Sequence, residues 1–246
     1  MGIRSDPVAG VPPPQGNVRM SWWLKLYGSD IGKKATMAIT GIVLFGFVMV
    51  HMLGNLKLYF GAAHYNEYSH WLREVGAPAF PPSSLLWVFR IVLLVAVALH
   101  VHSAYSLTLT NMRARPVDYA RRDTLEATHA ARTMRWGGVA LFLFVVYHLA
   151  HLTWGWRVVH PDFVAGDAYH NVVSGFRMWW VSAVYMAAQV ALGLHLYHGL
   201  SSMFQSLGWF RPGFEPSRRL FAQVFAWVVT LGNLSFPIAV LTGIVR

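Results

Sequence analysis

Five long apolar segments constrain what this chain can fold into. They cover roughly residues 35–56, 84–110, 136–156, 178–204 and 220–245. A helix needs about 20 apolar residues to cross a bilayer at a rise of about 1.5 Å per residue, so each segment is long enough to span. The runs are continuous rather than alternating, which argues against a closed β-barrel. The sequence therefore predicts an all-α integral membrane bundle of five transmembrane helices.

The composition agrees with a membrane protein, since 55% of the residues are hydrophobic, 12% are charged and the mean hydropathy is +0.41. The net charge of +10 would suit nucleic-acid binding in a soluble protein, but here the basic residues cluster in short loops between apolar segments. We therefore interpret them as determinants of topology and expect membrane lipid, but no nucleic acid, as a partner. With a cytoplasmic N-terminus, 14 of the 20 Lys and Arg residues fall on the inner side.

The chain divides into two parts in this interpretation. Residues 1–34 form a polar N-terminal tail and an interfacial segment, and residues 35–246 form the five-helix membrane domain. The first 20 residues are Pro-rich and lack the apolar core of a cleavable signal. A second short interfacial helix is expected at 64–75, on the outer surface. Pro237 lies in the last apolar segment, where we expect it to kink the helix.

Four histidines lie deep inside four of the apolar segments, where an ionisable group is costly and usually functional. By helical rise, His51 and His148 lie about 22 and 18 Å from the inner ends of their helices. His100 and His195 lie about 21 and 24 Å from the outer ends of theirs. The four therefore form an outer pair and an inner pair. Because paired imidazoles suit the two axial positions of an iron porphyrin, we expect an outer haem b on His51 and His148 and an inner haem b on His100 and His195.

Residues near the four histidines are consistent with two haem slots, but the sequence offers several candidates for each role. Histidines also follow at 102, 151 and 198, and spacing alone does not decide between His148 and His151 or between His195 and His198. Small residues that would open a slot are Gly41, Gly46, Gly54, Gly137, Gly138, Gly193 and Gly199. Cations at suitable levels for the propionates are Lys33, Arg90, Arg132, Arg135 and Arg177. The chain has no cysteine, which excludes a covalently attached c-type haem and a thiolate-bound iron–sulfur cluster.

With these features in place, the chain resembles the cytochrome b membrane anchor of succinate:quinone oxidoreductases and fumarate reductases, in the single-subunit, five-helix, di-haem class. The likeness covers nearly all of residues 30–246, and the strings HMLGN and ARPVDY are fairly specific. It is also carried by HYNEYSHWLREVG, ALHVHSAYSLTLTN, VVYHLAHLTWG and LGLHLYHGLSSMFQSLGWF. The resemblance implies the same four axial ligands. Gly193 departs from some relatives, which have a glutamate there on a proposed proton path.

The resemblance implies a subunit of succinate dehydrogenase, the respiratory complex II of the tricarboxylic acid cycle, in a bacterial cytoplasmic membrane. A flavoprotein subunit would oxidise succinate, and an iron–sulfur subunit would pass electrons to the inner haem. This chain would carry them through the outer haem to menaquinone or another quinone. The basic inner loop, 111–135, would dock the iron–sulfur subunit.

The quinone site has two candidate positions. On the outer side the candidates are Tyr65, Glu67 and His151, with His64 and His70 nearby. On the inner side they are Trp23, Ser29 and Lys33.

Three other classes of protein remain as alternatives. One is the di-haem cytochrome b subunit of another quinone-linked oxidoreductase, such as a formate dehydrogenase, a hydrogenase or a nitrate reductase. Another is a haem-free membrane anchor. A transporter is disfavoured because no acidic residue lies within a predicted span.

Overall fold

The computed structural model describes residues 22–114, 125–209 and 212–246 of the chain. Regular structure in these ranges is entirely helical, and η1 and η3 are 3₁₀ helices while η2 is a π-helix. The order is α1 (Trp22–Gly28), α2 (Asp30–Asn55), η1 (Leu56–Phe60), α3 (Ala62–Glu74), α4 (Ser84–Arg113), α5 (Leu125–His148), η2 (Leu149–Thr153), α6 (Ala168–Arg177), α7 (Trp179–Ser206), η3 (Pro212–Phe214) and α8 (Glu215–Leu241).

Five helical segments in the described part of the chain are long and apolar enough to cross a membrane. They are Asp30–Phe60, Ser84–Arg113, Thr133–Thr153, Trp179–Ser206 and Glu215–Leu241. This confirms the predicted all-α architecture with five spanning helices. Large apolar side chains remain exposed on these helices, for example Leu94 at 70% and Leu143 at 62%. Such extended apolar surface needs lipid rather than water around it.

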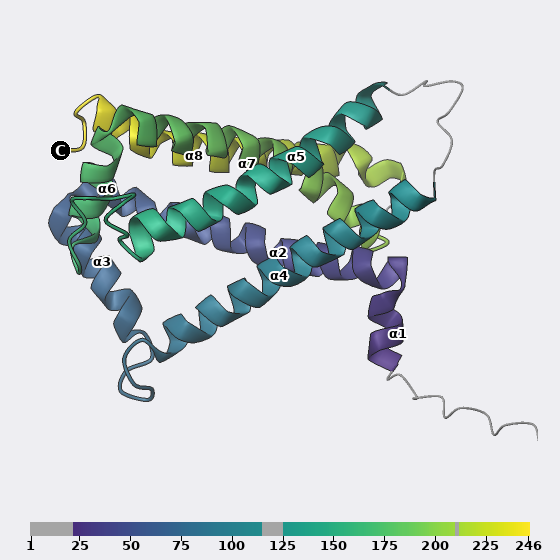
Figure 1. Ribbon diagram of the computed structural model, residues 1–246, viewed down its shortest axis with the longest axis horizontal. Coiled ribbons are helices and arrows are strands. Elements are labelled where there is room, and N and C mark those ends of the chain that lie inside the picture. The colour runs from purple at the N-terminus through teal and green to yellow at the C-terminus, as the bar shows by residue number, and fades with distance from the viewer. Residues whose placement is uncertain (1–21, 115–124, 210–211) are drawn as a thin grey trace, which may run out of the picture.

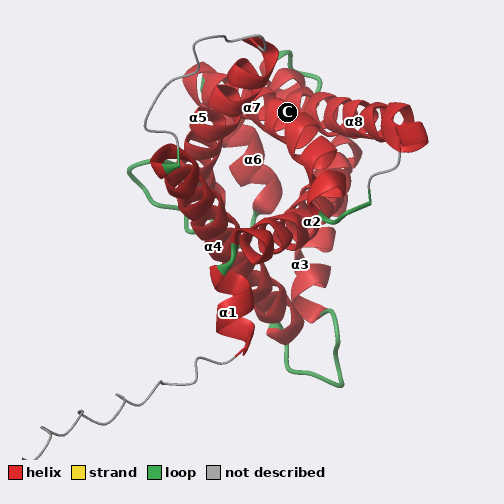
Figure 2. Ribbon diagram, turned by 90° about the vertical axis from the view of Figure 1, so that its right-hand side faces the viewer, coloured by secondary structure: helices red, strands yellow, loops and turns green. Residues whose placement is uncertain are grey.

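Four of the spanning helices surround a common axis, in the order α4, α2, α7, α5 (Figure 2). Direct packing joins α4 to α2, α2 to α7, and α7 to α5. The fifth, α8, lies outside this ring and packs mainly against α7 and less extensively against α2. As a result α2 lies diagonally opposite α5, and α4 lies diagonally opposite α7.

The short helices lie at the two ends of the bundle (Figure 1). The first, α1, lies at the end where α2 begins, and we call this the inner end. At the opposite end, α3 and α6 lie near the C-terminus, and we call this the outer end. The names follow the predicted topology, which stays a prediction. The interfacial helix expected at 64–75 is present as α3, with Tyr65 buried beneath it.

Local sequence sets where the first spanning helix begins and ends. Ser29 caps α2, because its hydroxyl accepts a hydrogen bond from the amide of Gly32 at 3.0 Å. The helix therefore begins at Asp30, five residues before the apolar segment predicted to start at 35, so residues 30–34 are helical. At the other end Gly61 has φ of +91°, a conformation that favours glycine and that separates η1 from α3.

Two helices are longer at the inner end than the apolar pattern predicts. The loop expected at 111–135 is shorter, since α4 continues to Arg113 and α5 begins at Leu125. Residues 115–124, which include the ARPVDY string after its first alanine, lie outside the described residues. Pro237 lies inside α8, which continues to Leu241, and its kink stays a prediction.

The sequence analysis missed α6, which closes the outer end of the bundle. Asp167 caps this helix by accepting the amide of His170 at 2.9 Å, and it also accepts Asn66 of α3 at 2.9 Å. Asn66 in turn accepts the amide of Tyr169 at 2.9 Å. These hydrogen bonds, first from His170 and then from Asn66, hold the pKa of Asp167 below its usual value, so the carboxylate stays charged at neutral pH.

We predict that Asp167→Ala lowers the free energy of unfolding by about 1 kcal/mol, the usual cost of losing an N-cap. The effect should be greatest near neutral pH. Because the native pKa is depressed, this contribution is present above the unfolded pKa near 3.8 and is lost as the pH falls through the native value. Thermal unfolding in detergent measures it.

Asp162→Ala is the matched control, because Asp162 is an exposed carboxylate in the same connection and only its backbone carbonyl bonds to His170. Equal destabilisation by the two variants at neutral pH would contradict the capping role.

Candidate functional site

The structure brings the outer histidines together. The ring centres of His51 on α2 and His148 on α5 lie 5.9 Å apart, with the planes at 85°. These helices are diagonal neighbours, so the side chains meet across the axis of the bundle. Phe47 stacks on His51 at 5.3 Å, and Phe144 lies beside His148 at 5.9 Å. An aromatic ring therefore flanks each member of this pair.

The inner histidines are brought together in the same way. The ring centres of His100 on α4 and His195 on α7 lie 6.3 Å apart, with the planes at 60°. These helices form the other diagonal of the ring. The two pairs thus use all four helices around the axis, and each helix supplies one histidine.

Both separations fit two imidazoles on opposite sides of one metal atom. A ring nitrogen binds a first-row metal at about 2 Å and lies about 1 Å from its ring centre, so the two centres are expected about 6 Å apart. The nitrogen Nδ1 of His195 is also buried without a hydrogen-bond partner among the described residues. An unpartnered buried polar atom costs about 1–3 kcal/mol, so it points to a group that these residues do not supply. The ring separations of both pairs, rather than this nitrogen, are what fit a metal-centred cofactor held through Nε2.

Hydrogen bonds to α2 fix the tautomer of His100. Its Nδ1 lies 3.1 Å from the carbonyl oxygen of Met37 and 3.2 Å from the hydroxyl of Thr40. A carbonyl oxygen only accepts, so Nδ1 carries the proton and donates it. The Thr40 hydroxyl donates instead to the carbonyl of Thr36 at 2.7 Å, which leaves its oxygen as an acceptor. The lone pair of His100 is therefore on Nε2, the state that a metal ligand needs.

The glycines expected to open the slots fall into three groups. Gly41 and Gly138 face the inner pair, since a Cβ there would meet Cε1 of His100 at 3.7 Å and of His195 at 3.9 Å. Gly54 and Gly193 instead allow close helix packing, against Tyr68 and Thr230 respectively. A Cβ at Gly46, Gly137 or Gly199 would meet no described atom within 4 Å.

The remaining histidines of the same helices lie in other environments. Tyr27 of α1 hydrogen-bonds to His102 and stacks on it at 5.7 Å, so His102 points away from the inner pair. His198 lies against Tyr197 at 5.0 Å. Because His148 lies beside His51 and His195 lies beside His100, the structure favours these residues over His151 and His198 as pair members.

A buried histidine cluster adjoins the outer pair, and the sequence analysis missed half of it. His151 and His160 are both 0% exposed, and their rings stack at 4.4 Å. Tyr185 hydrogen-bonds to His151 at 3.0 Å and to His148 at 3.2 Å. His160 lies in the connection after η2, and no helical periodicity in the sequence marks it as buried.

The three outer quinone candidates have different surroundings. Tyr65 is buried and donates its hydroxyl proton to Asn55 at 2.9 Å. Burial, together with nearby Tyr68, raises the pKa of Tyr65 to about 12, so it donates hydrogen bonds without ionising at neutral pH. Glu67 is exposed on α3, whereas His151 is enclosed. Their roles toward quinone stay predictions.

The remaining predicted propionate partners and quinone candidates are spread over the inner and outer ends of the bundle. Lys33 is half-buried, while Arg135 and Arg177 are exposed, and none of these three is placed beside a histidine pair by a described contact. Ser29 is used as the cap of α2. His64 and His70 are exposed on α3. The side chains of Trp23 and Arg132 lie outside the described residues.

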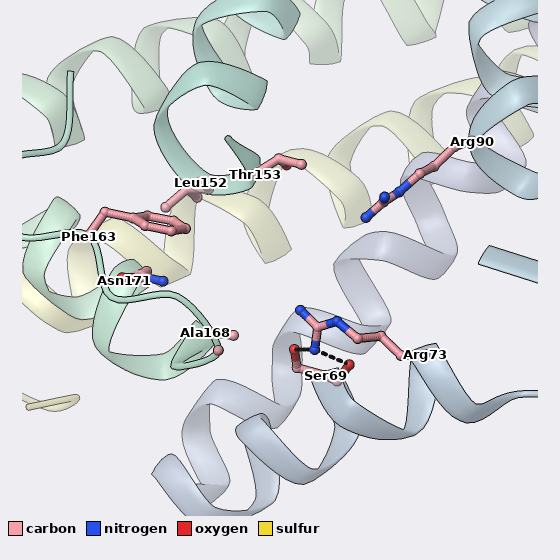
Figure 3. Close-up of a pocket in the computed structure, with 9 residues that line it drawn as sticks. Ser69, Arg73, Arg90, Leu152, Thr153, Phe163, Ala168 and Asn171 are labelled. Carbon is pink, nitrogen blue, oxygen red and sulfur yellow. Dashed lines mark hydrogen bonds between the residues drawn. The ribbon is translucent and has the colours of Figure 1, made fainter. Parts of the chain in front are cut away.

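A pocket of about 190 Å³ opens at the outer end, and η2, one of its walls, directly follows His148 (Figure 3). Arg73 of α3 and Arg90 of α4 both point toward it. Arg73 donates to the carbonyl and hydroxyl of Ser69 at 3.0 and 3.2 Å, and Arg90 lies 5.0 Å from the ring of Trp87. No carboxylate is among the described residues that line it. The pocket therefore suits an anionic or carbonyl oxygen, and Arg90 stays a predicted propionate partner.

Comparison with known proteins identifies a class for part of the chain. Residues 121–234 match the family model of the succinate dehydrogenase/fumarate reductase transmembrane subunit. No curated protein and no solved structure matches the chain. The matched residues contain all of α5, α6 and α7 and most of α8, and therefore one member of each histidine pair. This part of the chain is therefore similar to the membrane subunit of succinate dehydrogenases and fumarate reductases.

We predict that Gly175→Ala destabilises the protein by about 1–3 kcal/mol, as overpacking a buried site usually does. A Cβ at this position would lie 2.6 Å from Cε1 and 2.9 Å from Nε2 of His151, which is fully buried and cannot move without displacing His160. Thermal unfolding in detergent is the measurement.

Gly199→Ala supplies the control, because its Cβ would meet no described atom within 4 Å and alanine favours a helix over glycine by up to about 1 kcal/mol. The same substitution should thus have opposite signs at the two positions. Destabilisation at Gly199 as large as at Gly175 would show that the His151 contact is not the cause.

Proposed function

We propose that this chain is the membrane cytochrome b subunit of a succinate dehydrogenase, linking an iron–sulfur subunit to menaquinone or another quinone and holding two haems b. The observation that carries the proposal is the pair of histidine couples on the two diagonals of one helix ring. Their ring centres lie 5.9 and 6.3 Å apart, at two levels along the bundle. The family match supports the complex to which the chain would belong.

In this proposal His51 and His148 hold the outer haem, and His100 and His195 hold the inner one. The bound iron would supply the ability to accept and release one electron. The chain contributes orientation: the carbonyl of Met37 and the hydroxyl of Thr40 hold His100 with its metal-binding nitrogen free. Gly41 and Gly138 leave the space beside the inner pair open.

The inner end is the proposed docking face for the iron–sulfur subunit, whose own partner would be the flavoprotein subunit. Basic residues gather at this end, including Lys33, Lys34 and Arg135. Most of the predicted docking loop lies outside the described residues. A basic surface would favour an acidic partner and speed its association.

The outer end is the proposed quinone-binding region. Tyr65 offers a hydroxyl that stays protonated, Glu67 offers an exposed carboxylate, and the pocket beside Arg90 offers cationic donors. These features supply hydrogen bonds and a proton-exchanging group, which quinone chemistry needs. On the inner side, Trp23, Ser29 and Lys33 form the alternative quinone site.

We predict two haems b per polypeptide in the isolated complex, measured by a reduced-minus-oxidised spectrum and the haem-to-protein ratio. His100→Ala or His195→Ala should remove the inner haem, and His51→Ala or His148→Ala the outer one. The double variant His51→Ala with His148→Ala should therefore lose one haem, and His51→Ala with His195→Ala should lose both.

His102→Ala is the control and should keep both haems, because His102 is bound to Tyr27 outside the inner pair. Loss of only one haem from His51→Ala with His195→Ala would contradict the pairing. A wild-type complex without haem would favour a haem-free anchor. Copurified subunits, identified by mass, separate succinate dehydrogenase from the other quinone-linked oxidoreductases.

A further inference from the structure

A single buried hydroxyl connects the outer histidine pair to the histidine cluster behind it. Tyr185 of α7 is 5% exposed, and its hydroxyl oxygen lies 3.2 Å from Nδ1 of His148 and 3.0 Å from Nδ1 of His151. Phe144 and Phe176 pack edge-on against its ring at 5.0 and 4.9 Å. The ring is therefore held between aromatic neighbours, with its hydroxyl between two imidazoles.

The helix that carries His148 changes from an α-helix to a wider π-helix at this point in the chain. The chain leaves the α-helix directly after His148 and continues as the π-helix η2, which contains His151. Single π-turns within α-helices are rare and change the direction in which the following side chains point. Here the wider turn accompanies the placement of both histidines around one hydroxyl.

Only one arrangement of hydrogen-bond donors and acceptors in this cluster is compatible with metal binding by His148. If His148 binds a metal through Nε2, its Nδ1 carries the proton and donates it to the Tyr185 oxygen. The only proton of Tyr185 is then donated to Nδ1 of His151. The reverse order would place the His148 proton on Nε2 and block that nitrogen. His148 therefore donates to Tyr185, and Tyr185 donates to His151.

His151, which accepts the hydrogen bond from Tyr185, is held rigidly by its neighbours. His151 stacks on His160 at 4.4 Å and on Tyr147 at 5.6 Å, and Gly175 lies directly against its ring edge. His160 donates from Nδ1 to the carbonyl of His151 at 3.1 Å, and its Nε2 lies 3.0 Å from the hydroxyl of Ser174. With His151 fixed in this way, the Tyr185 hydroxyl has one preferred direction.

We propose that Tyr185 is a positioning residue for the outer haem ligand: through its hydroxyl it fixes the rotation of His148 and strengthens electron donation from that imidazole. The proposal rests on the proposed haem-binding function. An acceptor on the far nitrogen of a metal-bound histidine raises the basicity of the ligating nitrogen. Stronger donation stabilises ferric over ferrous iron, so Tyr185 lowers the midpoint potential of the outer haem.

The test is a redox titration of the isolated complex carrying Tyr185→Phe, followed by optical and low-temperature electron paramagnetic resonance spectra. We expect both haems to be retained, the midpoint potential of the outer haem to rise and its resonance signal to shift. The inner haem should be unchanged, because His100 uses Met37 and Thr40 instead. The His51→Ala variant identifies which signal belongs to the outer haem.

Tyr197→Phe is the matched control. Tyr197 lies on the same helix beside another histidine, His198, and no described residue hydrogen-bonds to its hydroxyl. This variant should leave both potentials at their wild-type values. A similar rise in Tyr185→Phe and Tyr197→Phe would overturn the assignment to the Tyr185 hydroxyl.

The outcomes separate the inference from the function on which it rests. A wild-type complex without two haems would end the proposed function. Two haems in the wild type with unchanged potentials in Tyr185→Phe would overturn only the role of Tyr185. If that variant does not assemble, His151→Leu decides. Removing the acceptor weakens Tyr185 as a partner of His148, so a smaller rise supports the inference and no rise overturns it.

Discussion

An imidazole inside a bilayer must find a partner, and the arrangement of this bundle follows from that constraint. Charged or polar side chains in hydrocarbon are costly unless they pair with another group or a cofactor. Here each of four helices in a ring contributes one histidine, and each histidine faces the one on the diagonal helix. The axis of the ring is therefore polar at two levels, whereas its outer surface is apolar and faces lipid.

The helices around this axis are held by contacts of different kinds. The inner pair depends on α2, whose backbone carbonyl at Met37 and hydroxyl at Thr40 receive the His100 proton. The outer pair depends on a side chain, Tyr185, which is itself fixed by a cluster of buried rings. The two levels thus have similar spacing but different hydrogen-bond acceptors. If both pairs hold haem as proposed, the different acceptors are expected to give the two haems different electronic properties.

The sequence predicted the parts of this structure that depend on distance along a helix. Apolar length predicted five spans, and the regular rise of a helix predicted which histidines share a level. It did not predict α6, the π-turn after His148 or the burial of His160, because these depend on how segments far apart in sequence meet. Asp167, for example, caps α6 and also accepts a hydrogen bond from Asn66 of α3, 101 residues earlier in the chain. Ser29 could have signalled the earlier start of α2, since a serine before an acidic residue is a common helix start.

Each histidine pair joins the first half of the polypeptide to the second half. Helices α2 and α4 precede residue 115, and α5 and α7 follow residue 124, so each level takes one imidazole from each half of the polypeptide. Neither half can complete a level alone. Any ligand shared by a pair is therefore a cross-link between the halves, and its binding energy adds directly to the cohesion of the bundle.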